Sequence, residues 1–359
     1  MFFKSNNKQY AMESEILEQA DVLKGLVDRY NTENIDLPDY VEKIVLVASG
    51  SSYHCARFSA DLLGEIADID ARAIYSSEFN LKKVIPHDKN TLYIFITQSG
   101  ETSDTLCALK RVNNGFTDAN GEKYYLNTLS ITNKPNSSIW NISKYKVDCA
   151  AGVEKSVAAT KSFSAQMLCV LIVALKIAQK KGQNIDEYLH SLNKLPGVIR
   201  ETYTLRPRII QLARLLSKQH CVVITADGIS YSIAKEGVLK IKETSYMNIN
   251  AAILGEFMHG HLAVLNNKSA LLYMSVDGIS QTAVSNLEKI RKDYNPATFI
   301  IGKHNNKFVS NFNINIDCEN EILQMFSNVI IVQLLAFEIA KKLGRNIDKP
   351  KGLKKVVIQ

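Results

Sequence analysis

Cysteine pairs and an export signal are both missing from the sequence. None of the six cysteines forms a CxxC pair, and most of them lie in apolar runs, as buried thiols do in proteins of a reducing compartment. Segment 1–8 has neither the apolar core nor the cleavage site of a signal peptide. These absences argue against a disulfide-stapled secreted domain and predict a cytoplasmic protein.

Long apolar runs and basic blocks are missing as well. The longest apolar candidate, 167–177, is about half the length of a membrane span, so no membrane partner is expected. The formal net charge is +7, but the lysines are spread along the chain without a basic block, a basic-aromatic cluster or a zinc spacing. We therefore expect no nucleic-acid partner and no metal, and a basic surface that attracts small anionic substrates.

Apolar runs typical of strands alternate with segments of helical periodicity. The expected strands are 44–48, 92–96, 125–132, 221–225, 271–274 and 298–301. The expected helices are 14–30, 53–67, 103–112, 161–180, 207–216, 230–245, 282–293 and 322–343. This alternation predicts an α/β protein whose parallel sheets are flanked by helices.

The chain contains an internal repeat. The stretch "ASGSSYHCA" from Ala48 resembles "ADGISYSIA" from Ala226, 178 positions later, and at the same offset Glu65 falls on Glu243. Nine identities fall within 32 positions without a gap. We expect two copies of one α/β domain, at 38–195 and 200–345, between an N-terminal helical arm (1–37) and a C-terminal tail (346–359).

Hydroxyl side chains follow two expected strands of the first copy. The residues that could hold an anion there are Ser51, Ser52, Thr97, Gln98, Ser99 and Thr102. A strand that leads into a helix presents unpaired N–H groups and the positive end of the helix dipole, and Gly100 would let the backbone approach a ligand. Ordinary helix capping by Ser and Thr is the alternative.

Two such loops in one domain favour a phosphate site over capping. Neither loop is a Walker A or a GxGxxG sequence, so no nucleotide is implied. In the second copy, segment 275–280 retains Gly278 but has lost much of the hydroxyl cluster, and Asp277 would repel an anion. The predicted phosphate site therefore belongs to the first copy.

The second copy carries candidate acid–base residues. Glu236, Lys240 and Glu243 lie at i, i+4 and i+7, which places them on one face of a helix. His259 follows in "GEFMHGH". A solvated charged face and a structural histidine are the plain alternatives, but a histidine downstream of a carboxylate–lysine face favours proton transfer.

The chain ends in "DKPKGLKKVVIQ", where Lys354 and Lys355 precede an apolar finish. A frayed basic terminus is one interpretation. The apolar finish favours a packed tail, and a lysine held away from water on such a tail would be suited to attack a carbonyl.

Together these motifs resemble the double SIS (sugar isomerase) domain family. The resemblance rests on "TQSGET", "EKSVAATKSF" (154–163), "LKIKE", "GEFMHG" and a lysine close to the C-terminus, and it runs from about residue 10 to residue 359. It is strongest for the isomerase domains of glucosamine-6-phosphate synthases and for SIS-type glucosamine-6-phosphate deaminases. The resemblance implies two tandem SIS domains, each flavodoxin-like, and no cofactor.

The resemblance also implies roles for the candidate residues. The 6-phosphate of a hexose or hexosamine would be bound by Ser51, Ser52, Thr97, Gln98, Ser99 and Thr102. Glu243 would move a proton between C1 and C2, and Lys355 would form a Schiff base with the ketose carbonyl. His259 would assist ring opening from a neighbouring subunit, which implies a homodimer. Glu236 and Lys240 would position the tail lysine and the proton shuttle.

Three features depart from the synthase pattern. The glutaminase domain, which begins with a nucleophilic cysteine, is not found, since the first cysteine is Cys55. Ala159 replaces a serine expected near the synthase sugar site, as in the deaminases. His261 stands where the family usually has a proline.

We therefore expect an enzyme that interconverts glucosamine 6-phosphate and fructose 6-phosphate plus ammonia, in the deaminating direction. One alternative is ammonia-dependent synthesis with a separate glutaminase partner. A second is a deglycase that releases an amino acid from a sugar phosphate adduct. A third, of another class, is a non-catalytic sugar-phosphate sensor. The sensor is disfavoured because it would not need Glu243, His259 and Lys355 together.

Overall fold

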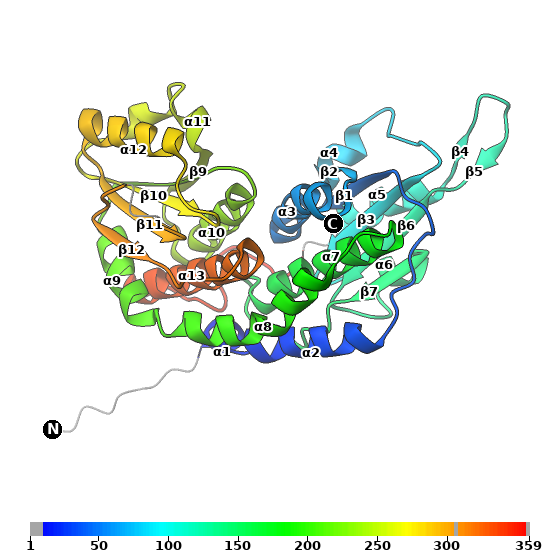
Figure 1. Cartoon of the computed structure of the whole chain (residues 1–359), viewed down its shortest axis with the longest axis horizontal. Coiled ribbons are helices and arrows are strands. Elements are labelled where there is room, and N and C mark those ends of the chain that lie inside the picture. The colour runs from blue at the N-terminus through cyan, green and yellow to red at the C-terminus, as the bar shows by residue number, and fades with distance from the viewer. Residues whose placement is uncertain (1–9, 305–307, 357–359) are drawn as a thin grey trace.

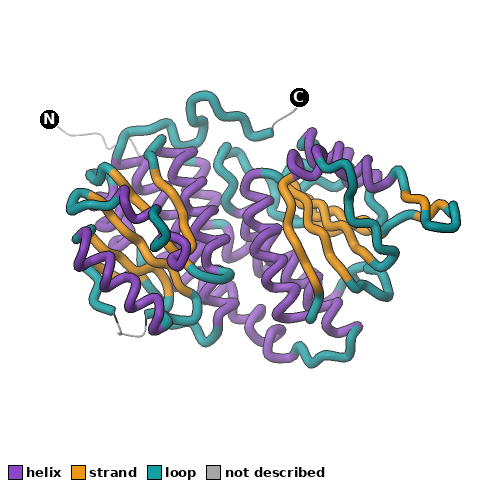
Figure 2. The backbone as a smooth tube through the Cα atoms, turned by 90° about the horizontal axis from the view of Figure 1, so that it is seen from above, coloured by secondary structure: helices purple, strands orange, loops and turns teal. Residues whose placement is uncertain are grey.

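The computed structural model describes residues 10–304 and 308–356, and it contains two α/β lobes joined by long helices (Figure 1). Each lobe has a five-stranded parallel sheet. Figure 2 shows the two sheets on opposite sides of a central layer of helices. The expected fold class is confirmed.

The first sheet has the order β2-β1-β3-β6-β7, the strand order of flavodoxin-like folds. Its strands are β1 (Lys43–Ala48), β2 (Asp70–Tyr75), β3 (Thr91–Thr97), β6 (Asn127–Thr132) and β7 (Tyr145–Asp148). Helices α3 (Gly50–Ala67) and α7 (Lys161–Lys180) cover the inner face. Helices α4 (Ser76–Leu81), α5 (Ser103–Asn113) and α6 (Ser138–Ile142) cover the outer face.

The second sheet has the order β12-β11-β10-β8-β9. Its strands are β8 (Cys221–Ala226), β9 (Ile249–Ile253), β10 (Ser269–Ser275), β11 (Ala297–Gly302) and β12 (Phe312–Ile314). Helices α10 (Ser230–Ser245) and α13 (Glu321–Lys342) cover the inner face, and α11 (Leu254–Phe257) and α12 (Gln281–Tyr294) cover the outer face. A short 3-10 helix, η1 (His261–Val264), follows α11.

Strand side chains alternate between two cores in both lobes. In β1, Ile44 and Leu46 point into an inner core shared by the two lobes, whereas Val45 and Val47 point into the outer core beneath α5. The shared inner core also contains the buried residues of α3, α7, α10 and α13. Apolar burial therefore joins the two lobes into one body.

The repeat is visible in the positions of the elements. Strands β1 and β8 begin 178 positions apart, at Lys43 and Cys221, and β3 and β10 keep this offset at Thr91 and Ser269. The offset then shortens, because a hairpin of β4 (Phe116–Thr117) and β5 (Lys123–Tyr124) precedes β6 in the first lobe. The corresponding connection in the second lobe, between α12 and β11, spans only residues 295–296.

The remaining helices link the lobes. The expected helix 14–30 is two helices, α1 (Ala11–Leu17) and α2 (Gln19–Thr32), which break at Glu18. Helices α8 (Asp186–Tyr203) and α9 (Arg206–Leu216) connect the two sheets. Because α8 runs through the interval between the expected domains, the limits 38–195 and 200–345 remain predictions. The first nine residues of the expected arm and residues 357–359 of the expected tail lie outside the described residues.

The four strands of the two sheets that the sequence pattern misses are all edge strands. The strands β2 and β7, and β9 and β12, lie at the edges of their sheets and are only partly buried. A strand that is not buried on both faces needs no continuous apolar run. Helix α8 was missed because Pro196 and Gly197 interrupt its helical pattern.

Two helices have a longer apolar stretch than expected, although their bounds were predicted to within one residue. Helices α7 and α13 are long and apolar enough to cross a membrane by composition, so the expectation that no segment reaches that length was wrong. However, 89% of the apolar window of α7 and all of that of α13 are buried inside the protein. Such burial is typical of helices in a protein core.

We predict that the close contact between α10 and α13 requires Gly237. A Cβ at Gly237 would lie 2.9 Å from Val332, so Gly237→Ala should lower the free energy of unfolding by about 1–3 kcal/mol through overpacking. Gly25→Ala in α2 is the matched control, because no atom lies within 4 Å of its Cβ position. This control should raise stability by roughly 0.5–1 kcal/mol through helix propensity. Urea unfolding measures both changes, and equal stability of the two variants would contradict the prediction.

Candidate functional site

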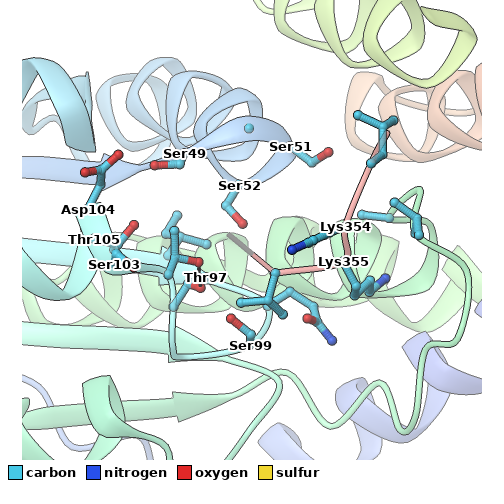
Figure 3. A pocket seen from close by; sticks show the side chains of 18 of the residues that line it. Ser49, Ser51, Ser52, Thr97, Ser99, Ser103, Asp104, Thr105, Lys354 and Lys355 are labelled. Carbon is cyan, nitrogen blue, oxygen red and sulfur yellow. Dashed lines mark hydrogen bonds between the residues drawn. The ribbon is translucent and has the colours of Figure 1, made fainter. Parts of the chain in front are cut away.

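A cavity of about 350 Å³ opens at the carboxyl edge of the first sheet. The six predicted anion-binding residues all line it: Ser51, Ser52, Thr97, Gln98, Ser99 and Thr102. Lys240 and Glu243 of α10 and Lys355 of the tail line it as well. The cavity therefore brings together residues of the first lobe, the second lobe and the C-terminal tail. In Figure 3 the serines and threonines lie on one side of the cavity and the tail lysines on the other.

The hydroxyl groups at the two helix N-termini do not cap their helices. Ser49 precedes α3 and Thr102 precedes α5, and neither makes a side-chain hydrogen bond to its helix. Instead, the hydroxyls of Thr97 and Thr102 are 3.0 Å apart, and the Ser52 hydroxyl donates to Gln166 Oε1 at 3.1 Å. The capping alternative is thus not what the structure shows at these two positions. First-turn residues of both helices line the cavity, and a helix N-terminus is a site where an anion can accept from backbone N–H groups.

Gly100 is required for the packing of its own turn. It does not line the cavity; its φ is +70°, and a Cβ there would lie 2.0 Å from the Ser137 hydroxyl. That Gly100 lets the backbone approach a ligand stays a prediction. Glycine is required here because the turn packs against Ser137 in a left-handed conformation.

The corresponding loop of the second copy is closed on itself. The Ser275 hydroxyl accepts from the Gly278 N–H at 2.8 Å and also lies 3.3 Å from Asp277. A hydroxyl that is used within its own loop is not free for a ligand. This contact agrees with the assignment of the predicted anion site to the first copy.

The charged face of α10 is buried rather than solvated. Lys240 is almost fully buried, and its ammonium lies 2.6 Å from Glu243 Oε2, 3.4 Å from Glu236 Oε1 and 3.0 Å from the Ser51 hydroxyl. Burial, the largest influence, lowers the pKa of Lys240, but the charges of Glu236 and Glu243 raise it above the ordinary lysine value. Lys240 is therefore held as a cation between two carboxylates.

Glu236 is fully buried beneath this cluster and does not itself line the cavity. Its Oε2 lies 2.8 Å from His54 Nδ1, and because a carboxylate only accepts, that ring nitrogen donates. Burial raises the pKa of Glu236, yet Lys240 and His54 together hold it below the ordinary value. The pair of Glu236 and His54 joins α10 to α3 across the two lobes.

The start of the tail packs against the body of the protein, whereas residues 351–354 are exposed. Ile347 is buried, and the Asp348 carboxylate accepts from the N–H groups of Ala11 and Met12 at 3.0 Å each. The Val157 N–H donates to the Asp348 carbonyl oxygen at 3.1 Å. The start of α1 and the loop before α7 thus hold the tail beside the cavity.

Lys355 is bound to a buried carboxylate that the sequence pattern did not single out. Its ammonium lies 2.5 Å from Glu154 Oε2 and 2.7 Å from the Ser156 carbonyl oxygen. Burial raises the pKa of Glu154, but the charge of Lys355 and hydrogen bonds from Ser162 and Thr160 bring it below the ordinary value. We expected a lysine that is held away from water. Lys355 is in addition fixed in position by its ion pair with Glu154.

His259 lies away from the cavity. It follows α11 in the second lobe and is exposed, and it does not line the cavity described above. His261, which also departs from the family pattern, begins η1 and lines a separate hollow with Glu256 and Phe257. In one chain, then, the structure gathers every predicted site residue except His259 at or directly beneath one cavity.

Sequence reasoning missed several residues that shape the site. His54, Glu154 and Gln166 each hold a predicted residue in place. Ala159, which was expected near the sugar site, and Lys354 of the tail also line the cavity. His54 stands one turn after Ser51, which was the available signal. No group of three or more His, Cys, Asp or Glu side chains within the described ranges could hold a metal ion.

Comparisons with known proteins agree with this architecture. The SIS domain family matches residues 41–176 and 215–341. The glutamine–fructose-6-phosphate aminotransferase (isomerizing) of Campylobacter jejuni is 31% identical over 369 aligned positions, which cover 99% of this chain and 59% of that protein. The protein of the same name from Escherichia coli strain K12 is 31% identical over 368 positions, covering 97% and 59%. The chain thus spans about three-fifths of the length of these relatives.

Solved structures share the fold. The C-terminal domain of glucosamine-fructose-6-phosphate aminotransferase from Francisella tularensis gives a TM-score of 0.86 at 24% identity, over 96% of this chain and 99% of that chain. Glucosamine-6-phosphate deaminase from Thermotoga maritima gives a TM-score of 0.78 at 21% identity, over 98% and 100%. At these identities the similarity shows the fold alone.

Proposed function

Because this chain belongs to the SIS domain family, we propose that it is a phosphosugar aldose–ketose isomerase that acts on amino sugar phosphates. The reaction that fits best hydrolyses glucosamine 6-phosphate to fructose 6-phosphate and ammonia. One observation carries the proposal: Lys240 and Glu243 of α10, Lys355 of the tail and the two hydroxyl loops of the first lobe all line one cavity. The hydroxyl loops are the segments that hold Ser51 and Ser52, and Thr97, Gln98, Ser99 and Thr102.

The hydroxyl loops would bind the 6-phosphate. Ser51 accepts a hydrogen bond from Lys240 and lines the cavity, and Thr97 and Thr102 share one hydrogen bond between two hydroxyls. Neutral donors and helix N–H groups suit a phosphate that must also leave. Holding the phosphate away from the reacting carbons orients C1 and C2 without changing the chemistry there.

The other side of the cavity would perform the proton transfers. Glu243 is partly exposed in the cavity, where its carboxylate could move a proton between C1 and C2. In the deaminating direction this proton leaves C2 of the open-chain aldehyde and returns at C1, which converts the C2 amine into an iminium. Lys355, after it leaves Glu154 and loses a proton, would add to C2 and release ammonia, and water would then hydrolyse the Lys355 Schiff base to fructose 6-phosphate. Glu236 and Lys240 would hold Glu243 in position.

Ammonia-dependent synthesis of glucosamine 6-phosphate is the second candidate. It is favoured by the similar proteins from Campylobacter jejuni and Escherichia coli, which are named aminotransferases, and it would require a separate glutaminase partner. Deamination is favoured by Ala159, which lines the cavity where the synthase pattern has a serine. The deglycase and the sensor remain alternatives with less support.

We predict that purified protein releases ammonia and fructose 6-phosphate from glucosamine 6-phosphate. Glu243→Gln should lower kcat by about a hundredfold or more and leave the binding of a sugar phosphate almost unchanged, because only the proton acceptor is lost. The matched control is Glu65→Gln, since Glu65 occupies the equivalent repeat position on α3 and does not line the cavity. Absence of both products from the wild-type protein in a coupled assay would refute the proposed reaction, and galactosamine 6-phosphate tests the epimer.

A role for His259 would require a second copy of the chain. His259 is exposed and outside the cavity of its own chain, so we predict that it completes the site of a partner in a homodimer. Lys355→Ala and His259→Asn should each be almost inactive alone. Co-expressed in equal amounts, they should recover about a quarter of wild-type activity, because half of the dimers are mixed and each has one intact site. If the mixture stays inactive although mixed dimers are isolated, the shared site is wrong.

A further inference from the structure

Three lysines line the cavity, and two of them are paired with carboxylates. Lys240 pairs with Glu236 and Glu243, and Lys355 pairs with Glu154. Lys354 is exposed and has no ion pair or hydrogen bond with any residue of the ranges 10–304 and 308–356. Of the lysines lining the cavity, it is the one whose charge is available to a ligand.

The fixed position of Lys355 determines where Lys354 points. Lys355 is held on one side by Glu154 and by the Ser156 carbonyl oxygen. Figure 3 shows Lys354 extending toward the serine and threonine side chains of the hydroxyl loops, whereas Lys355 extends away from them. The tail therefore places two adjacent lysines on opposite sides, one toward its carboxylate and one toward the predicted phosphate site.

The hydroxyl loops alone do not balance the charge of a phosphate dianion. The serines and threonines are neutral donors, and Asp104 of α5 adds a carboxylate to the lining of the cavity. A carboxylate opposes the binding of an anion, and the N-terminal dipole of α5 offsets only part of that charge. A cation on the facing side would supply the missing charge as a charge-assisted hydrogen bond.

We propose that Lys354 is a substrate-binding residue whose ammonium pairs with the phosphate dianion held by the two hydroxyl loops. This inference rests on the proposed function and adds a source of selectivity to it. A sugar phosphate carries two negative charges where a sugar sulfate of similar shape carries one. The site should therefore prefer the phosphate ester, and Lys354 should account for most of that preference.

Calorimetric titration with glucose 6-phosphate and glucose 6-sulfate tests the inference. At about pH 8 the phosphate ester is a dianion, because its second pKa is about 6. Lys354→Gln should weaken the binding of glucose 6-phosphate by roughly tenfold to a hundredfold and that of glucose 6-sulfate much less. Lys354→Arg should keep the preference. Lys351→Gln is the matched control, since it removes the same charge from the same tail but does not line the cavity.

The outcomes separate this inference from the proposed function. If Lys354→Gln binds both esters as the wild type does, or if its affinity for both falls equally, Lys354 does not distinguish the phosphate dianion from the sulfate monoanion, and the inference is wrong. If Lys351→Gln weakens the binding of glucose 6-phosphate as much as Lys354→Gln does, the effect comes from the overall positive charge of the tail, and the inference is also wrong. If the wild type binds neither ester, the proposed function itself fails. Circular dichroism of each variant shows whether it is folded.

Discussion

A lysine buried between two carboxylates fixes the geometry of the site. The Lys240 ammonium contacts Glu236, Glu243 and the Ser51 hydroxyl, and Glu236 in turn binds His54. Removing one member of such a buried cluster would leave an uncompensated charge, which is costly in a protein interior. Because Ser51 and His54 belong to α3 and the charged residues to α10, this cluster holds the hydroxyl loops at a set distance from the acid–base face.

The two copies of the repeat have acquired complementary tasks. The first lobe presents hydroxyl groups and helix N-termini to an anion, whereas the Ser275 hydroxyl of the second lobe is hydrogen-bonded within its own loop. The second lobe instead contributes the charged face of α10. At the position of α3 that corresponds to Lys240, the first lobe has Leu62. A cavity between unequal copies can thus separate the binding of a remote group from the chemistry at the reacting carbons.

Much of this arrangement could be predicted from the sequence, and the exceptions have physical reasons. Buried central strands such as β3 are continuous apolar runs, whereas edge strands such as β2 are half-exposed and have no such signal. The spacing of Glu236, Lys240 and Glu243 predicted that they share one face of a helix. That this face is buried depends on its packing against α3, which the spacing does not reveal. The contacts of His54 and Glu154 join residues 182 and 201 positions apart, beyond the reach of any local pattern.

The central claim is that one cavity holds the phosphate on the first lobe and the reacting carbons on the second. A crystal structure of the protein with fructose 6-phosphate tests it most directly. We predict that the phosphorus atom lies between Ser51–Ser52 and Thr97–Thr102, with C1 and C2 facing Glu243 and Lys355. A phosphate bound instead at the loop of Ser275 and Gly278, or outside the cavity, would contradict it.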